Sequence, residues 1–146
     1  MTIFYDLTYR TPVARQRFLA LDAFTRGFVE SAFWVFDDDD LDRLGKVFDD
    51  LDPAALAKME ADCQRFQAEN AEPLALAYAF AGGYTPREAG RDFYLTRSRA
   101  DVGFWSRGFG DQDQPGTLGF ALCKAAEAYP PLHLIRDARG FHLGVL

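Results

Sequence analysis

Three times along this chain, a threonine or an aspartate is followed directly by a proline: Thr11-Pro12, Asp52-Pro53 and Thr85-Pro86. The side-chain oxygen of the residue before a helix accepts a hydrogen bond from a free backbone N–H. Proline suits the first helical position because it has no N–H to leave unpaired. Each pair therefore predicts the start of a helix. The third start is the strongest, because Glu88 follows Thr85 by three residues and completes a capping box.

Apolar residues recur at helical spacing behind these starts. We expect helices over residues 12–35, 53–69, 74–80 and 118–129, the last one capped by Thr117. The second helix has the clearest apolar stripe, formed by Leu56, Met59, Cys63 and Phe66. A stripe of this width predicts a helix that lies on the surface and turns one face to the core.

The stretch from Thr85 to Gly108 begins as a short helix and then becomes rich in aromatic residues. Residues 92–97 (DFYLTR) and 102–107 (VGFWSR) have a composition typical of strands, and residues 98–101 would join them as a hairpin. A second hairpin is predicted from residues 132–136 and 141–146, with Gly140 suited to a positive φ in the turn. We therefore predict an α+β fold. N-terminal helices precede a β-β-α-β-β unit, which forms one antiparallel sheet packed by helices.

The length and composition favour one domain over residues 1–146. Its first part, residues 1–84, is expected to be mainly helical and to carry an acidic loop at 37–52. Residues 85–146 would form the hairpin, helix and hairpin. Hydrophobic residues make up 49% of the chain and aromatic residues 15%, which is enough for a core and excludes a disordered chain.

Cys63 and Cys123 lie far apart and on apolar stripes, which predicts two buried, reduced thiols. The first ten residues lack the apolar run of a signal peptide, and no run approaches the ~20 apolar residues of a membrane span. These features favour the cytoplasm and predict no contact with a membrane. The oligomeric state stays open.

Aspartates are concentrated between residues 37 and 52. Eight of them stand against Arg43 and Lys46, so this segment carries a charge equal to the whole net charge of −6. Such density disfavours burial and predicts a solvated acidic loop. A second interpretation is an acidic patch that contacts a basic partner. The residues that would make that contact are Asp37, Asp38, Asp39, Asp40, Asp42, Asp49 and Asp50.

A calcium loop is a third interpretation of the same segment. Asp38, Asp40 and Asp42 have the spacing of the first three ligands of such a loop. However, Arg43 stands where the loop needs glycine, and Asp49 stands where it needs a bidentate glutamate. The pattern therefore predicts no metal here.

Motifs that would indicate catalysis are missing from the sequence. There is no phosphate-binding loop, no HExxH and no GxSxG. The two histidines, His133 and His142, fall in the last hairpin, where they would form a surface pair. A zinc site would need further ligands, such as a remote cysteine or aspartate. We therefore predict a protein that is not an enzyme and that uses no cofactor.

The aromatic hairpin supports an alternative function. Bases of single-stranded nucleic acids stack on aromatic side chains, and arginines bind the phosphates. The residues that would do so are Tyr94, Arg97, Arg99, Trp105 and Arg107. Packing of the aromatic residues in the core is the competing interpretation. The acidic balance of the chain also opposes the binding of phosphate backbones, so direct contact with nucleic acid is the less favoured prediction.

Residues 89–97 (AGRDFYLTR) and 103–108 (GFWSRG) together resemble a motif in small acidic proteins of bacteriophages and prophages, where it approximates AGHDFWLTRNGHGAGFWDRG. Residues 28–34 (FVESAFW) are similar to a segment YVEAALW of those proteins, and residues 56–66 (LAKMEADCQRF) to LAKMREDCADF. Arg91 and Tyr94 stand where the motif has histidine and tryptophan, and residues 98–102 replace the turn NGHGA.

The resemblance covers residues 20–142 and implies a phage-encoded accessory protein, although the family has no defined biochemical activity. Small acidic phage proteins often bind and block a host machine. We therefore expect an inhibitor of a host defence complex, of the anti-CRISPR or anti-restriction kind. Its acidic loop would mimic nucleic acid by occupying a basic channel of that complex.

Overall fold

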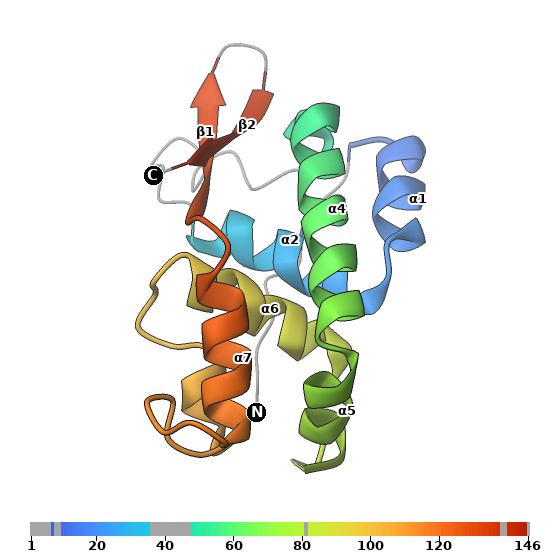
Figure 1. Cartoon of the computed structure of the whole chain (residues 1–146). Helices are drawn as coiled ribbons and strands as arrows, with labels where there is room; N and C mark the ends of the chain where they lie inside the picture. The colour runs from blue at the N-terminus through green and yellow to red at the C-terminus, as the bar shows by residue number, and fades with distance from the viewer. Residues whose placement is uncertain (1–6, 8–9, 36–47, 81, 138–139, 146) are drawn as a thin grey trace.

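The structure is a computed structural model that describes residues 7, 10–35, 48–80, 82–137 and 140–145. Figure 1 shows helices α2 and α6 crossing the middle of the molecule, with α4 and α7 in front of them and the β-hairpin at one end. The elements, in chain order, are α1 (Pro12–Ala20), α2 (Ala23–Val35), η1 (Phe48–Asp50), α4 (Pro53–Glu69), α5 (Ala71–Phe80), α6 (Pro86–Arg97), η2 (Phe104–Arg107), α7 (Leu118–Glu127), β1 (Leu132–Asp137) and β2 (Gly140–Val145).

The predicted helix caps are confirmed. The side-chain oxygens of Thr11, Asp52, Thr85 and Thr117 each accept a hydrogen bond from a backbone N–H of the following helix, over 2.8–3.2 Å. Helices α4 and α7 cover the ranges expected for them to within two residues. Helix α5 begins three residues before the predicted position, because the chain turns directly out of α4 at Asn70.

The single helix predicted over residues 12–35 is wrong, because the chain breaks at Leu21 and Asp22. The Asp22 carboxylate accepts a hydrogen bond from the Thr25 N–H over 2.8 Å and so caps a new helix, α2. Burial raises the pKa of Asp22, but hydrogen bonds from Thr25 and Gln67 outweigh it, and the pKa lies below its usual value. Asp22 lies among apolar residues at helical spacing, but it caps α2 instead of continuing one long helix.

Helices α2 and α6 cross at two glycines. A Cβ atom on Gly27 would lie 1.9 Å from the Arg87 carbonyl oxygen, and one on Gly90 would lie 1.8 Å from the Phe24 carbonyl oxygen. No side chain fits in that space, so each glycine lets the backbone of one helix rest on the other. This close crossing forms the centre of the molecule.

Aromatic rings fill the space around the crossing. Phe93 of α6 stacks on Phe66 of α4 with ring centroids 4.1 Å apart, and it also contacts Phe24 and Phe28 of α2. All four side chains are fully buried. Rings packed in this way add stacking energy to the burial of a large apolar area. One helix, α6, thus supplies the centre against which α2 and α4 pack.

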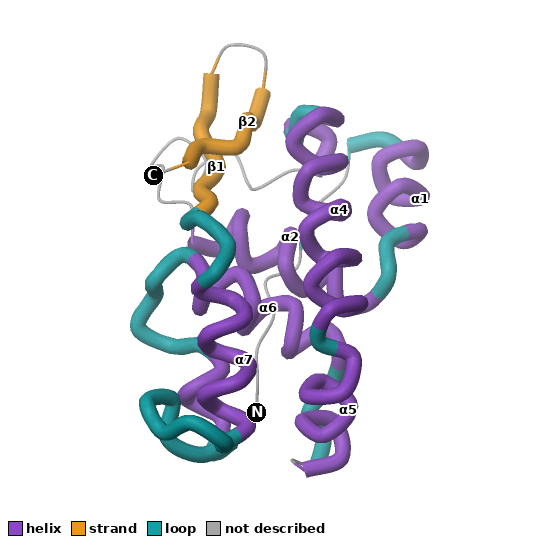
Figure 2. The backbone as a smooth tube through the Cα atoms, viewed as in Figure 1, coloured by secondary structure: helices purple, strands orange, loops and turns teal. Residues whose placement is uncertain are grey.

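The predicted β-β-α-β-β unit is wrong. Residues 92–97 belong to helix α6, and residues 104–107 form the short helix η2. Among the described residues the only sheet is the two-stranded pair β1–β2, so the fold is mostly helical rather than α+β with a four-stranded sheet (Figure 2). Residues 92–97 are buried all round. Six residues span less than two helical turns, and a short run with three consecutive apolar residues, Phe93 to Leu95, looks like a strand.

The last hairpin is confirmed. Strands β1 and β2 pair antiparallel, and Gly140 opens β2 with the predicted positive φ, +126°. The hairpin is tied to the rest of the chain at Phe141, whose carbonyl oxygen accepts a hydrogen bond from the Asp52 N–H over 2.9 Å. Within the described ranges, no helix combines the length and the apolar character that crossing a membrane would require.

Candidate functional site

The acidic segment, residues 37–52, is described only at its C-terminal end. Asp37, Asp38, Asp39, Asp40 and Asp42 lie outside the described residues, and so does most of the calcium-loop pattern. Phe48 begins the described end and is buried, with its ring 5.2 Å from that of Phe18. Leu51 is also buried. The acidic segment therefore rejoins the hydrophobic core at residue 48.

Asp49 and Asp50 pair with the residues just before α1. Asp49 accepts hydrogen bonds from the Arg10 N–H (2.7 Å) and the Thr11 hydroxyl (2.8 Å), and Asp50 pairs with the Arg10 guanidinium. Although slight burial raises the pKa of Asp49, these hydrogen bonds outweigh it and lower the pKa overall. Both residues, predicted to contact a partner, thus fasten the end of the acidic segment to α1 while keeping part of their surface exposed.

The five residues predicted to bind nucleic acid do not form one surface. Tyr94 and Arg97 are each only 1% exposed, inside the core. Trp105 is half-buried and Arg99 is exposed at the end of α6, where it pairs with Glu127 over 3.4 Å. Without a hairpin at residues 92–107, the alternation that would have set aromatic and basic side chains on one face is lost.

Arg107, the fifth of these residues, binds a buried carboxylate. Its Nε and Nη2 atoms both donate to Asp92 over 2.8 Å, and the Tyr84 hydroxyl donates to the same carboxylate over 2.7 Å. Asp92 is fully buried. Burial raises the pKa of Tyr84, and the nearby Asp92 charge adds to that rise, so the phenol stays protonated as a donor. This paired charge holds η2 against α6.

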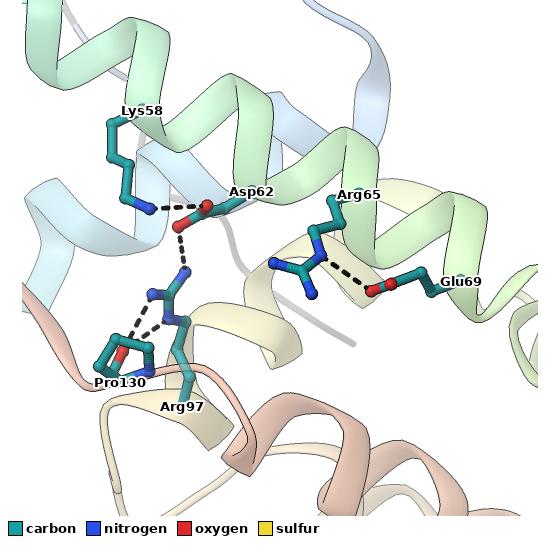
Figure 3. Close-up of polar contacts among 6 residues, drawn as sticks. All are labelled: Lys58, Asp62, Arg65, Glu69, Arg97 and Pro130. Atoms are coloured by element: carbon teal, nitrogen blue, oxygen red, sulfur yellow. Dashed lines mark hydrogen bonds and ion pairs between the residues drawn. The ribbon is translucent and has the colours of Figure 1, made fainter.

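Arg97 is a second buried charge, at the end of α6. It donates from Nη1 to Asp62 over 3.0 Å, and from Nε and Nη2 to the Pro130 carbonyl oxygen over 3.1 and 2.9 Å (Figure 3). Its guanidinium also lies over the rings of Phe93 and Tyr129, 5.3 and 5.0 Å from their centroids. Arg97 therefore joins α6 to α4 and to the segment between α7 and β1.

Packing thus explains several residues of the stretch 89–108. Gly90 allows the helix crossing, Asp92 pairs with Arg107, and Arg97 pairs with Asp62. Thr96 accepts a hydrogen bond from the Phe104 N–H over 3.1 Å, and a Cβ on Gly103 would lie 2.5 Å from the Thr96 hydroxyl oxygen. These residues hold the fold together.

A groove lies beside Arg97, between α4 and the end of α7. Its volume is about 320 Å³, and its walls are formed by Lys58, Asp62, Arg65, Glu69, Asn70, Ala125, Ala128, Tyr129 and Pro130. Along α4 the charges alternate. Lys58 pairs with Asp62 over 3.0 Å and Arg65 pairs with Glu69 over 3.2 Å, as Figure 3 shows. Opposite them, α7 presents the small side chains of Ala125 and Ala128.

Tyr129 is one of the residues that line this groove. The Arg65 guanidinium lies 5.7 Å from its ring centroid, and the Arg97 guanidinium lies 5.0 Å from it. The Tyr129 hydroxyl oxygen is buried and has no hydrogen-bond partner among the described residues. Burial raises the pKa of Tyr129, and the Glu69 carboxylate raises it further. A buried hydroxyl of this kind is uncommon in a folded protein.

The histidines and cysteines form no metal site in the described part of the chain, where no three potential ligands gather. His133 stands opposite Gly144 and His142 opposite Ile135, so the two histidines are diagonal neighbours on the hairpin. His142 Nδ1 lies 3.3 Å from Asp52. Both cysteines are buried as predicted. Burial raises the pKa of Cys123 to about 11 and that of Cys63 well above its usual value, so both stay protonated at neutral pH.

Sequence reasoning missed Asp62 and Tyr129. Asp62 lies off the apolar stripe of α4, yet it is only 7% exposed because Arg97 reaches it from α6. Tyr129 falls at the end of the helix predicted over residues 118–129, where nothing in the sequence singles it out. Only a predicted contact between α4 and α7 would have found this groove, and local periodicity carries no such information.

Comparison of the chain with protein-family models, with curated proteins and with solved structures found no match.

Proposed function

We propose that this chain is a phage-type accessory protein that binds and inhibits a host defence complex, of the CRISPR or restriction kind, through the acidic segment. The observation that carries the proposal is the charge distribution. Eight aspartates and only two basic residues occupy positions 37–52, and their charge equals the net charge of the whole protein, −6. The resemblance to small acidic phage proteins supports the same function.

The packing of the other charged residues also supports this proposal. Asp92, Arg97, Arg107 and Asp62 neutralise one another inside the fold. The acidic segment has no comparable internal neutralisation available from its own sequence, because only Arg43 and Lys46 lie within it. Excess charge of one sign attracts a surface of the other sign and speeds association.

The residues before and after the acidic segment are held in the fold. Phe48 and Leu51 are buried in the core, and Asp49 binds the start of α1. On the other side, Phe33 near the end of α2 is fully buried. The residues on both sides of the acidic segment are therefore fixed to the fold. Fixed ends reduce the conformational entropy that a segment loses when it binds a partner. The partner is a basic surface of the kind that holds nucleic acid in the host cytoplasm.

The test is binding to purified CRISPR effector and restriction complexes, measured by pull-down and by inhibition of DNA cleavage. We expect the protein to be retained by one such complex and to inhibit it in a stoichiometric manner. The triple variant Asp38→Asn, Asp39→Asn, Asp40→Asn should bind about tenfold or more weakly. Binding of the unaltered protein should also weaken as salt rises, because exposed charges are screened.

The matched control is the triple variant Glu72→Gln, Asp101→Asn, Asp113→Asn, which removes the same charge from exposed positions elsewhere. It should inhibit as well as the unaltered protein. Equal losses in the two triple variants would mean that net charge alone matters. Full inhibition by the Asp38–Asp40 variant would exclude the acidic segment as the contact, and failure to bind any complex of either kind would contradict the proposed function.

A further inference from the structure

The described end of the acidic segment already binds a cationic group that comes from outside the segment. The Arg10 guanidinium forms an ion pair with Asp50, and the Arg10 backbone N–H donates to one oxygen of Asp49 over 2.7 Å. The Thr11 hydroxyl donates to the other oxygen of Asp49 over 2.8 Å. Asp49 and Asp50 both belong to the set of aspartates predicted to contact a basic partner. The protein itself therefore occupies part of that predicted contact.

The two halves of this contact differ in how easily they open. Asp49 is held by a backbone N–H and by the hydroxyl of the residue that caps α1, so its partners are fixed by the course of the chain. The pair of Arg10 with Asp50 lies in solvent, with 60% of the arginine side chain and 36% of the aspartate side chain exposed. Exposed ion pairs are weak, because water screens them and a long side chain loses freedom in forming them. The guanidinium can therefore leave Asp50 while Asp49 stays bound.

The Arg10 guanidinium does to Asp50 what a cation of a basic partner would do. It donates to the carboxylate and cancels one negative charge at this end of the acidic segment. A second cation that approaches the same carboxylate meets a like charge beside it, which reduces the attraction. A basic surface therefore binds Asp50 best when the guanidinium has moved aside.

We propose that Arg10 is an internal competitor of the basic partner: its guanidinium covers Asp50 in the free protein and is displaced when a cationic surface binds. The proposal rests on the function proposed above for the identity of that partner. An exposed ion pair of this kind changes an equilibrium constant by about two- to fivefold, so removal of the guanidinium should raise the affinity for a cationic surface by that factor.

The test compares the variants Arg10→Gln and Arg65→Gln of the whole protein. Each variant loses one positive charge and one exposed ion pair, because Arg65 pairs with Glu69 on the surface of α4. Arg65 lies ~18 Å along α4 from Pro53, so its charge is screened from the acidic segment at about 0.15 M salt. Arg10→Gln keeps the backbone N–H that binds Asp49.

The probe is a hexa-arginine peptide, and its binding is measured by isothermal titration calorimetry at about 0.15 M salt. We expect Arg10→Gln to bind the peptide about two- to fivefold more tightly than the unaltered protein, and Arg65→Gln to bind it as the unaltered protein does. In a protein that carries Asp50→Asn, the guanidinium has no carboxylate to cover at this position. The further change Arg10→Gln should then lose most of its effect.

Three results would overturn the proposal. They are equal affinities of Arg10→Gln and Arg65→Gln for the peptide, weaker binding by Arg10→Gln than by the unaltered protein, and a gain of the same size when Asp50 is already asparagine.

The same variants, measured on the host complexes, separate this proposal from the proposed function. If no complex binds although Arg10→Gln gains affinity for the peptide, the proposed function fails and the internal competitor stands. If a complex binds the unaltered protein and Arg10→Gln equally well, the internal competitor fails and the proposed function stands.

Discussion

The centre of this molecule and its acidic segment are both rich in charge, but they use it in opposite ways. At the centre, Asp92 and Arg97 are at most 1% exposed, and each is bound by a charged residue from another part of the chain. In the acidic segment, aspartates outnumber basic residues by eight to two. Paired buried charges specify how helices meet, whereas an excess of one sign favours a partner outside the protein.

This contrast changes how the stretch from Gly90 to Gly108 is interpreted. In the stretch from Gly90 to Gly108, six residues each meet a specific neighbour within the fold: Gly90, Asp92, Thr96, Arg97, Gly103 and Arg107. Such residues cannot change one at a time without loss of stability. Substitutions at the centre should therefore lower the free energy of unfolding, and substitutions of Asp38, Asp39 and Asp40 should affect binding alone.

The largest expected effect is that of Asp92→Ala. The change leaves the Arg107 guanidinium without its buried partner and the Tyr84 hydroxyl without its acceptor, so the free energy of unfolding should fall by about 3–5 kcal/mol. Chemical denaturation measures it. Asp101→Ala, at an exposed position nearby, should change stability by less than about 0.5 kcal/mol. Equal losses of stability in the two variants would mean that Asp92 does not form a buried ion pair with Arg107.

The helix crossing gives the next largest effect. Gly90→Ala places a methyl group where the Phe24 carbonyl oxygen lies 1.8 Å away, so α2 and α6 must move apart, at a cost of about 3 kcal/mol. Gly82→Ala is the control, because its new methyl group would have no neighbour within 4 Å among the described residues. The two midpoints of urea denaturation should differ clearly. Similar midpoints would place the helices further apart than described.

The variant Tyr84→Phe tests the contribution of the Tyr84 hydroxyl apart from that of its ring. The ring remains in its contact with Phe109, and only the hydrogen bond to Asp92 is lost, which should cost about 2 kcal/mol because the acceptor is charged. Tyr78→Phe changes a ring 6.0 Å away whose hydroxyl makes no hydrogen bond in the described part of the chain. It should be close to neutral, and a larger loss there than at Tyr84 would contradict the network.

Asp22→Ala tests an exposed charge with a structural role. Loss of the cap of α2 should cost about 1 kcal/mol at pH 7. The pKa of Asp22 is lowered in the folded protein, so its stabilising effect is complete above the usual aspartate pKa and is lost as the pH falls through the lowered value. Denaturation of both proteins from pH 7 to pH 3 should show their difference shrink below about pH 4. A constant difference would exclude the carboxylate as the cause.

The smallest change in stability is expected from the triple variant Asp38→Asn, Asp39→Asn, Asp40→Asn. Removing three like charges from a chain of net charge −6 should shift the free energy of unfolding by less than about 0.5 kcal/mol. Its binding to a host complex should nevertheless be the most impaired. A loss of stability as large as that of Asp92→Ala would end the distinction between the two regions.

Local chemistry in the sequence determined where most helices begin and where the last hairpin turns. The caps at Thr11, Asp52, Thr85 and Thr117 and the positive φ of Gly140 depend only on neighbouring residues, so they could be predicted. The burial of both cysteines followed from their places on apolar stripes. The density of charge between residues 37 and 52 is likewise a property of the sequence alone.

Only the tertiary structure decided what the buried residues do. Residues 92–97 form the buried end of α6, which packs on α2, α7 and η2, and six residues are too few to show whether the period is that of a helix or of a strand. Arg97 meets Asp62 across 35 positions of sequence, and Arg107 meets Asp92 across 15. The groove beside Tyr129 exists because two helices distant in sequence lie close together. Contacts between distant residues depend on the whole fold, which no local pattern contains.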